Sequence, residues 1–319
     1  MWSPRYLLIE TVLEHWKEPI RQKLLDSIKS HIGGDWRVIG VLGYPVQHSL
    51  SPAMQNAAIQ ALSLPLVYVP FEVSPEHLAT ALDGLSALNM VGVNLTIPHK
   101  EAAVPLMDAL ASRADRIGSV NTVVFDGGKK IGYSTDGIGF LTPLHERRFQ
   151  LKGAQCVIIG AGGAGRAILY ALGESGASVS IINRTPTRSE RLAAEVNQVW
   201  PGIAKHLEWA DKTEVEAAFR SCDLLVNATP LGMAPHDKEV EWDLPLRTLP
   251  STAFVYDLVY RPAKTRLMEI AEDCGCETMN GLKMLVHQGA ESFRIWTGIT
   301  PPVAVMERAA LEQLRSCEA

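Results

Sequence analysis

The sequence feature that most constrains the fold is a strand, turn and helix pattern at residues 155–172, near the middle of the chain. A short apolar run, Gln155–Ile159, leads into Gly160-Ala161-Gly162-Gly163-Ala164-Gly165, and an alanine- and leucine-rich segment follows. Residues without a Cβ let the backbone turn sharply and approach a pyrophosphate, whose charge meets the N-terminus of the next helix. Because the glycines stand between a strand pattern and a helix pattern, they indicate a dinucleotide-binding fold rather than a simple glycine-rich connector.

A second nucleotide signal follows the next predicted strand, at Asn183-Arg184-Thr185-Pro186-Thr187-Arg188. An NAD-specific fold places an acidic residue about twenty residues beyond the glycines, where it binds the ribose hydroxyls. This chain has two arginines and a threonine there instead. Paired guanidinium groups suit the dianionic 2′-phosphate of NADP in charge and geometry, so we predict NADP(H) as the cofactor. The alternative is a solvated basic turn.

Length and composition limit which classes of protein this chain can belong to. A chain of 319 residues exceeds the size at which a single core usually stops growing, so we expect two domains. With 47% hydrophobic and 20% charged residues, the composition is that of a soluble globular protein. A formal net charge of −5 gives no sign of a nucleic-acid or membrane surface, so small molecules are the expected partners.

The N-terminus and the cysteines are typical of a cytoplasmic protein. Residues 1–5 lack the basic and apolar regions of an export signal, and no run of about 18 apolar residues could cross a membrane. The five cysteines show no regular spacing, and Cys274-Gly275-Cys276 lacks the second ligand pair of a structural zinc site. We expect reduced thiols and, because the nine histidines also lack metal-ligand spacing, no metal.

Residues 1 to about 33 predict an N-terminal helix, because apolar side chains recur every three or four positions. Pro19 should kink or split this helix, and Gly33-Gly34 should end it. Its apolar stripe must be buried. We expect it to pack against its own domain, with dimerisation as the alternative.

From Arg37 onward, strand patterns alternate with helix patterns, which predicts an α/β fold with mainly parallel pairing and right-handed crossovers. The expected strands are Arg37–Gly43, Leu66–Val73, Met90–Leu95, Ser119–Phe125, Lys130–Ser134, Gln155–Ile159, Ser178–Ile182, Lys205–Glu208, Leu224–Ala228 and Phe254–Leu258. The expected helices are Ala53–Leu62, Pro75–Ala87, Lys100–Leu110, one after Asp136, one from the glycine-rich turn, Leu282–Trp296 and Val303–Leu314.

These elements predict two α/β domains separated by a cleft. The first takes residues 35–137 and also residues 282–319, because the last two helices should brace the cleft by returning to it. The second, residues 138–281, carries the glycine-rich turn and should be a Rossmann-type domain. Residues 1–34 would form a helical extension.

Candidate chemistry in the first domain lies in Asn94-Leu95-Thr96-Ile97-Pro98-His99-Lys100, at the end of a predicted strand. Ligands of open α/β sheets bind outside the carboxyl ends of strands, so Thr96 and Lys100 should point into the cleft. Taken alone, a lysine after a proline is also a common surface residue. His48 and His99 stand beside candidate site residues, and we interpret both as turn residues.

The chain resembles shikimate dehydrogenases from about Ile39 to Ile299, through motifs that follow the order of that family. They are Gly43-Tyr44-Pro45, His48-Ser49-Leu50-Ser51-Pro52, Asn94 through Lys100, Gly118 through Thr122, Gly132 through Gly137, the glycine-rich turn, Asn183-Arg184-Thr185, Asn227 through Met233, Tyr256 through Tyr260, and Asn280-Gly281-Leu282 through Gln288-Gly289-Ala290. The N-terminal segment lies outside the usual pattern of the family.

The resemblance implies the site residues, with Lys100 as the acid/base residue and Asp136 as its partner. It assigns substrate binding to Ser49, Ser51, Thr96, Lys100, Asn121, Asp136, Tyr260 and Gln288. It assigns cofactor binding to Gly160, Ala161, Gly162, Gly163, Ala164, Asn183, Arg184, Thr185, Arg188, Thr229, Met233, Leu258 and Gly281. Singly, each polar residue could instead hold a turn or cap a helix.

The implied reaction is a reversible hydride transfer that interconverts 3-dehydroshikimate plus NADPH with shikimate plus NADP, a step of chorismate and aromatic amino acid biosynthesis. Hydroxyl and amide side chains can bind the ring hydroxyls and the carboxylate without a metal. Two alternatives stay open. One is a quinate/shikimate dehydrogenase of broader specificity, which would usually accept NAD. The other is a noncatalytic ligand-sensing paralogue, which should have lost the Lys100 and Asp136 pair that this chain has.

Overall fold

The computed structural model describes residues 34–234 and 243–318. It confirms an α/β protein built on two six-stranded sheets, whose strands come from residues 37–133 and 155–279. Residues 38–319 form one compact unit, and the domain boundaries expected at 137/138 and 281/282 stay predictions. The predicted N-terminal helix of residues 1–33, with its kink at Pro19, lies outside the described residues.

The first sheet has the strand order β2-β1-β3-β5-β6-β4. Its elements in chain order are β1 (Arg37–Gly43), α3 (Ser51–Ala61), β2 (Leu66–Glu72), η1 (Pro75–His77), α4 (Leu78–Ala87), β3 (Gly92–Leu95), α5 (His99–Ala102), η2 (Val104–Leu106), β4 (Ala109–Leu110), α6 (Ser112–Ile117), β5 (Thr122–Asp126) and β6 (Lys129–Tyr133). β1 and β3 are parallel, as their separation by helices predicts. β5 runs antiparallel to β3, with Asn94 opposite Thr122. The carboxyl end of β3 and the start of β5 therefore lie side by side.

The segment after β3 shows that the prediction of a single helix over Lys100–Leu110 is wrong. α5 ends at Ala102, η2 follows, and Ala109 then pairs with Ile131 where β4 joins β6. Pro105 explains the break, because a helix continuing through a proline loses a backbone hydrogen bond and the ring clashes with a carbonyl of the preceding turn. The remaining residues are therefore free to add an edge strand.

The second sheet has the strand order β12-β11-β10-β7-β8-β9, and its neighbouring strands are parallel. The later elements are α7 (Asp136–Glu146), β7 (Gln155–Ile159), α8 (Gly163–Glu174), β8 (Ser178–Ile182), α9 (Pro186–Val199), β9 (Ala204–Leu207), α10 (Lys212–Arg220), β10 (Leu224–Asn227), η4 (Leu246–Thr248), β11 (Phe254–Asp257), α11 (Arg266–Asp273), β12 (Glu277–Met279), α12 (Leu282–Thr297) and α13 (Val303–Glu318). β8 and β9 follow β7 on one side, whereas β10, β11 and β12 continue the sheet on the other side of β7. Dinucleotides bind at the point where the strand order reverses in this way. The sequence pattern missed β12, whose three residues are too few to show an alternation.

The turn between β7 and α8 requires glycine at two places. Gly160 has a φ of +108°, a conformation that side chains rarely adopt. A Cβ at Gly165 would lie 2.2 Å from the carbonyl oxygen of Gly160. α8 therefore starts close to the end of β7 only because both residues lack a side chain.

Gly165→Ala is expected to lower the free energy of unfolding by about 2 kcal/mol, because the clash involves backbone atoms that cannot move without shifting α8. Urea unfolding followed by circular dichroism measures this loss. Gly84→Ala is the matched control, since it adds a Cβ with nothing within 4 Å in the middle of α4 and should be neutral or stabilising. Equal losses in the two variants would contradict the steric explanation.

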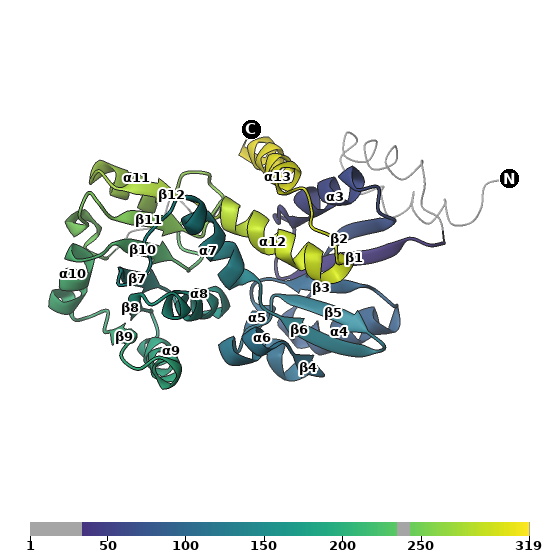
Figure 1. Cartoon of the computed structure of the whole chain (residues 1–319), viewed down its shortest axis with the longest axis horizontal. Helices are drawn as coiled ribbons and strands as arrows, with labels where there is room; N and C mark the ends of the chain where they lie inside the picture. Colours follow the sequence, from purple (N-terminus) through teal and green to yellow (C-terminus); the bar gives the residue numbers. More distant parts are fainter. Residues whose placement is uncertain (1–33, 235–242, 319) are drawn as a thin grey trace. The chain divides into compact units, whose positions relative to one another are not determined.

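The last two helices pack on the first sheet, as the sequence predicts. Phe293 of α12 and Met306 of α13 share a buried core with Ile39 of β1, and Figure 1 shows α13 beside α3. α12 also runs along α7, and its Met284 joins the core that Phe140 of α7 forms with the second sheet. The side chains of α12 therefore reach both cores, and polar residues on this helix can approach the residues that follow β6.

Candidate active site

Lys100 and Asp136 meet at the carboxyl edge of the first sheet. Lys100 lies on α5, just beyond β3, and Asp136 is the first residue of α7, just beyond β6. Lys100 Nζ lies 2.6 Å from Asp136 Oδ2, and only 3% of the Asp136 side chain is exposed. A charge-assisted hydrogen bond in a partly buried place is stronger than one at the surface. The pair thus fixes the ε-amino group while 18% of the lysine side chain stays accessible.

Asn121 joins this ion pair to α12. Its Nδ2 atom lies 2.9 Å from Asp136 Oδ1, 3.1 Å from Gln288 Oε1 and 2.8 Å from Thr135 Oγ1. The two N–H groups of the amide are therefore shared among three acceptors. The backbone N–H of Thr135 donates to Asn121 Oδ1 at 2.8 Å. Four residues predicted from the sequence, Lys100, Asn121, Asp136 and Gln288, thus form one connected network.

The glycine-rich turn lies against the base of the Lys100 side chain. A Cβ at Gly163 would be 2.9 Å from Lys100 Cβ and 3.0 Å from Ser119 Oγ. A Cβ at Gly160 would be 2.7 Å from Thr229 Cγ2, in the loop after β10. The turn therefore lies between Lys100 and that loop, so the predicted catalytic and cofactor residues are adjacent.

The N-terminus of α8 suits a bound anion. Within the described residues, no side chain forms a capping hydrogen bond at Gly162, which precedes the helix. The first N–H groups of a helix have no acceptor inside it and carry the positive end of its dipole. Asn183 Oδ1 accepts a hydrogen bond from the backbone N–H of Ala161 at 3.1 Å and holds the turn beside the segment after β8. A pyrophosphate fits these donors.

The basic segment after β8 is exposed at the start of α9. Arg184 and Thr185 face solvent, and Asn183 Nδ2 donates to the Thr185 carbonyl at 2.8 Å. Arg188 Nη2 lies 3.0 Å and 3.2 Å from the two carboxylate oxygens of Glu101. No motif indicates a role for Glu101, since a glutamate beside Lys100 carries no signal of a partner in a distant helix.

Four other predicted cofactor residues lie in the loops after β10, β11 and β12. A Cβ at Gly281 would lie 1.9 Å from the Leu258 carbonyl oxygen, so these two backbones are in contact. Thr229 Oγ1 donates to Asn227 Oδ1 at 2.6 Å. Met233 is 45% exposed. All of these residues follow the carboxyl ends of parallel strands, where ligands of such sheets bind.

The remaining predicted substrate residues are not joined to the Lys100 and Asp136 pair by direct hydrogen bonds within the described part of the chain. Ser49 Oγ accepts a hydrogen bond from the backbone N–H of Ser51 at 3.2 Å, which is a local turn contact. Thr96 directly follows β3, and its backbone N–H donates to the Leu42 carbonyl at 2.9 Å. Tyr260 packs on the core around α3, and burial raises the pKa of its hydroxyl.

A buried carboxylate to which the sequence motifs assign no role, Asp257, joins the end of β10 to the loop after β11. Asp257 ends β11 and accepts hydrogen bonds from Asn227 Nδ2 at 2.8 Å, the Val259 N–H at 3.0 Å and Thr265 Oγ1 at 2.6 Å. Asn227 in turn accepts the Thr229 N–H at 3.0 Å. The available signal was an aspartate at the end of an otherwise apolar strand. Asp257 therefore holds in place the loops that carry the predicted cofactor residues.

Asp257 should make stability depend on pH. Burial raises its pKa from 3.8 to about 6, although three donors oppose the shift. Between pH 3.8 and about 6, the Asp257 carboxyl is therefore protonated in the folded protein and ionised in the unfolded chain. The contribution to stability is complete below pH 3.8 and is lost as pH rises through 6, by about 3 kcal/mol in total.

Asp257→Asn removes this titration. The free energy of unfolding of the variant, minus that of the parent protein, should therefore increase between pH 4 and 6 and stay constant above pH 6. Urea unfolding of both proteins across this range measures the difference, and any constant offset from altered hydrogen bonds cancels. Asp211→Asn is the control, because Asp211 is an exposed helix cap. Parallel pH profiles of the Asp257→Asn variant and the parent would refute the prediction.

The two histidines beside the site differ from each other. His48 lies in an exposed turn, as predicted, with Nδ1 3.2 Å from Arg261 Nη1. The interpretation of His99 as a turn residue is wrong. The turn ends one residue earlier, so His99 begins α5, is fully buried and places Nε2 2.8 Å from the Val73 carbonyl oxygen. Burial lowers the pKa of this imidazole.

Four cysteines within the described residues, Cys156, Cys222, Cys274 and Cys276, are free thiols. In the same part of the chain, no group of three or more histidine, cysteine, aspartate or glutamate side chains is placed to hold a metal ion. No helix among residues 34–234 and 243–318 is long and apolar enough to cross a membrane.

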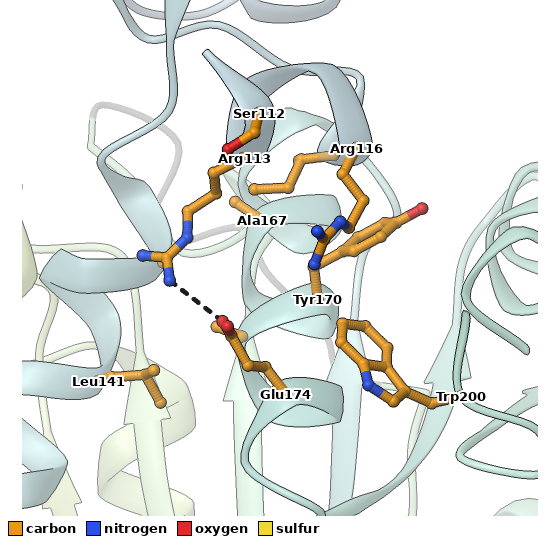
Figure 2. A pocket seen from close by; sticks show the side chains of 11 residues that line it. Ser112, Arg113, Arg116, Leu141, Ala167, Tyr170, Glu174 and Trp200 are labelled. Atoms are coloured by element: carbon orange, nitrogen blue, oxygen red, sulfur yellow. Dashed lines mark hydrogen bonds and ion pairs between the residues drawn. The ribbon is translucent and has the colours of Figure 1, made fainter.

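A cavity of about 160 Å³ lies between α6, α7 and α8 (Figure 2). Arg113, Arg116, Tyr170, Glu174 and Trp200 are among the residues that line it. Arg113 Nη2 lies 3.1 Å from Glu174 Oε2, at the dashed line in Figure 2. None of the site residues predicted from the sequence lines the cavity, so we do not assign the candidate active site to it.

The arrangement around Lys100 combines two chemical capacities. An amine fixed by a buried carboxylate can give a proton to a ligand oxygen or take one from it. The backbone N–H groups of the adjoining turn and helix can hold an anionic group within reach of that amine. A site of this kind suits proton transfer on a ligand that is held beside a nucleotide.

Three family descriptions match successive parts of the chain. The shikimate dehydrogenase substrate binding domain matches residues 41–123. The shikimate/quinate 5-dehydrogenase description matches residues 143–233, and the shikimate 5′-dehydrogenase C-terminal domain matches residues 281–311.

Individual relatives match over nearly the whole chain. The shikimate dehydrogenase (NADP(+)) of Methanopyrus kandleri is 46% identical over 294 residues, which cover 91% of this chain and 100% of the relative. That of Symbiobacterium thermophilum is 45% identical and covers 88% of this chain and 96% of the relative. The structure of a Thermus thermophilus shikimate 5-dehydrogenase in complex with NADP(H) and shikimate is 40% identical, with a TM-score of 0.78 and coverage of 87% of this chain and 100% of that one.

Proposed function

The chain belongs to the shikimate dehydrogenase family, and from this premise we propose that it catalyses the NADP-dependent, reversible reduction of 3-dehydroshikimate to shikimate. The Methanopyrus kandleri relative is named for the NADP-dependent activity, and the Thermus thermophilus structure holds both NADP(H) and shikimate. One observation carries the proposal for this chain. Lys100 is ion-paired with a buried Asp136 at 2.6 Å and lies against the glycine-rich turn.

The cofactor is proposed to bind along the carboxyl edge of the second sheet. The uncapped N-terminus of α8 provides N–H donors for the pyrophosphate. Arg184 and Arg188, at the start of α9, provide the positive charge for the 2′-phosphate. Leu258 and Gly281, whose backbones are in contact after β11 and β12, are proposed to bind the nicotinamide half of the cofactor.

Proton transfer is assigned to Lys100. In the reducing direction the substrate oxygen gains negative charge, and the Lys100 ammonium gives it a proton. Asp136 Oδ2 orients this ammonium, while Asn121 holds the other carboxylate oxygen at 2.9 Å. In the oxidising direction the neutral amine takes the proton from the hydroxyl. NADP(H), when bound, supplies or accepts the hydride.

Substrate orientation is assigned to polar side chains around this pair. We propose that Ser49, Ser51, Thr96, Tyr260 and Gln288 bind the ring hydroxyls and the carboxylate, in addition to Asn121. Hydroxyl and amide groups can donate or accept a hydrogen bond as each ring position requires. If a bound ring lacks one of these hydroxyls, the protein group that would pair with it loses its hydrogen bond. The cost of that unpaired group makes the site selective.

Initial rates with shikimate and with quinate, each against NADP and against NAD, test the proposal. Shikimate with NADP should be the best pair, by about tenfold or more over each of the other three. Comparable rates with quinate and NAD would favour a quinate/shikimate dehydrogenase instead. Binding of shikimate without turnover of any pair would favour a noncatalytic ligand-sensing protein.

The wider setting follows from the same proposal. The step belongs to the shikimate pathway of aromatic amino acid biosynthesis, and we propose a cytoplasmic enzyme, with a homodimer as one of two alternatives for its oligomeric state. Substrate-binding residues would come from 35–137 and 282–319, and cofactor-binding residues from 138–281. Analytical ultracentrifugation tests the dimer, and a monomeric mass at assay concentrations would exclude it.

A further inference from the structure

Arg188 has an acidic neighbour that the proposed function does not use. Glu101 directly follows Lys100 on α5, whereas Arg188 lies in the first turn of α9, in the second half of the chain. The two side chains form an ion pair, with exposed fractions of 53% for Arg188 and 40% for Glu101. This contact joins the helix of the proposed acid/base residue to the proposed 2′-phosphate site.

Both hydrogen bonds use the same nitrogen of Arg188. Nη2 lies 3.0 Å from Glu101 Oε1 and 3.2 Å from Oε2. A guanidinium binds a phosphate or a carboxylate as a fork, through Nε and Nη2 or through Nη1 and Nη2. Because Nη2 belongs to both forks, a phosphate bound to Arg188 through either fork shares this nitrogen with Glu101 and lies next to its carboxylate.

We propose that Glu101 tunes the preference for NADP over NAD by competing with the 2′-phosphate for Arg188. The inference rests on the proposed function, since it takes Arg188 as a phosphate ligand. A carboxylate displaced from Nη2 also stays near the dianion and repels it. NAD has a hydroxyl in place of this phosphate and meets neither effect. Glu101 is thus a specificity residue that acts through Arg188 and weakens the binding of NADP alone.

The expected effect is moderate because both side chains are partly exposed. Exposed ion pairs contribute little, so removing the Glu101 charge should tighten binding of the phosphate by about two- to fivefold. The direction of the change is diagnostic. A glutamate that merely orients Arg188 for the phosphate would give weaker binding after its removal.

The experiment compares Glu101→Gln with the parent protein by isothermal titration calorimetry. The probes are 2′,5′-ADP, which carries the 2′-phosphate, and 5′-AMP, which lacks it, and neither needs hydride transfer to be detected. The Kd of 2′,5′-ADP should fall about two- to fivefold, and that of 5′-AMP should stay unchanged. Glu174→Gln is the matched control, since Glu174 is 52% exposed, pairs with Arg113 at 3.1 Å and loses the same charge.

Arg188→Ala and the double variant separate the two levels of the proposal. If Arg188→Ala leaves the preference for 2′,5′-ADP unchanged, the assignment of Arg188 to the 2′-phosphate fails. If Arg188→Ala removes that preference but Glu101→Gln does not tighten 2′,5′-ADP, the competition is overturned. If Glu101→Gln tightens the binding of 2′,5′-ADP even when Arg188 is alanine, Glu101 does not act through Arg188. The same conclusion follows if Glu174→Gln tightens this binding equally. If the effect of Glu101→Gln disappears in the double variant, the proposal is supported.

Discussion

Replacing Lys100 with alanine is expected to lower kcat by about 10² to 10⁴-fold, with a smaller change in the KM for shikimate. The substitution removes the amine that Asp136 holds at 2.6 Å and leaves the glycine-rich turn and the other substrate residues in place. General acid/base catalysis typically accounts for a loss of this size. Initial rates at saturating NADP, with shikimate varied, separate the effect on kcat from the effect on KM.

The control for this variant is Lys212→Ala. Lys212 Nζ also lies 2.6 Å from a carboxylate oxygen, that of Asp243, but both side chains are largely exposed. Exposed ion pairs contribute little to stability, so this variant should keep the parental rate. Near-normal turnover of Lys100→Ala, in a protein with parental circular dichroism, would remove Lys100 from the mechanism.

Converting both Arg184 and Arg188 to alanine is expected to raise the KM for NADPH by about 10²- to 10⁴-fold. Hydrogen bonds between a guanidinium and a phosphate are charge-assisted, and the loss of each costs about 1.5 to 3 kcal/mol. NADH has no 2′-phosphate, so its KM should change far less. Steady-state rates with the two reduced cofactors, at a fixed concentration of 3-dehydroshikimate, give the ratio directly.

A second pair of arginines provides the control for net charge. Arg113 and Arg116 line the cavity beside α6, away from the start of α9, and their replacement by alanine removes the same two charges. This variant should keep the parental ratio of the two KM values. Equal losses with NADPH and NADH in the Arg184 and Arg188 variant would contradict recognition of the phosphate by these residues.

The elements that the sequence predicted best are those that short-range patterns specify. The strand at Ser178–Ile182 has the predicted bounds, because its β-branched residues Val179, Ile181 and Ile182 favour a strand and turn residues flank it. The predicted turn after Gln155–Ile159 also occurs, since only glycine tolerates the positive φ at Gly160. The helix predicted over Lys100–Leu110 is wrong because it extends through Pro105, which a helix interior does not tolerate.

The candidate site was predicted in part. Motifs identified Lys100 and Asp136, which lie 36 residues apart in the chain and meet in the structure. Motifs could not indicate the pairing of Glu101 with Arg188, which lie 87 residues apart, because neither residue type specifies a distant partner. The role of Asp257 was missed for a related reason. One of its donors, Asn227, ends β10, whereas Val259 and Thr265 follow β11, and only the packing of β10 beside β11 brings Asn227 to Asp257.

The sequence by itself determined the α/β class, the nucleotide-binding turn and the chemical types of the site residues. Each of these depends on a few neighbouring residues, whose backbone preferences and charges act over a single turn or strand. Only the tertiary structure decided which of these residues touch, as with Asn121 and Gln288, which lie 167 residues apart and are joined at 3.1 Å. Such contacts depend on where α12, which follows the last strand of the second sheet in the sequence, packs. That position results from the burial of apolar side chains such as Phe293 and Met284 in two cores, which local sequence does not specify.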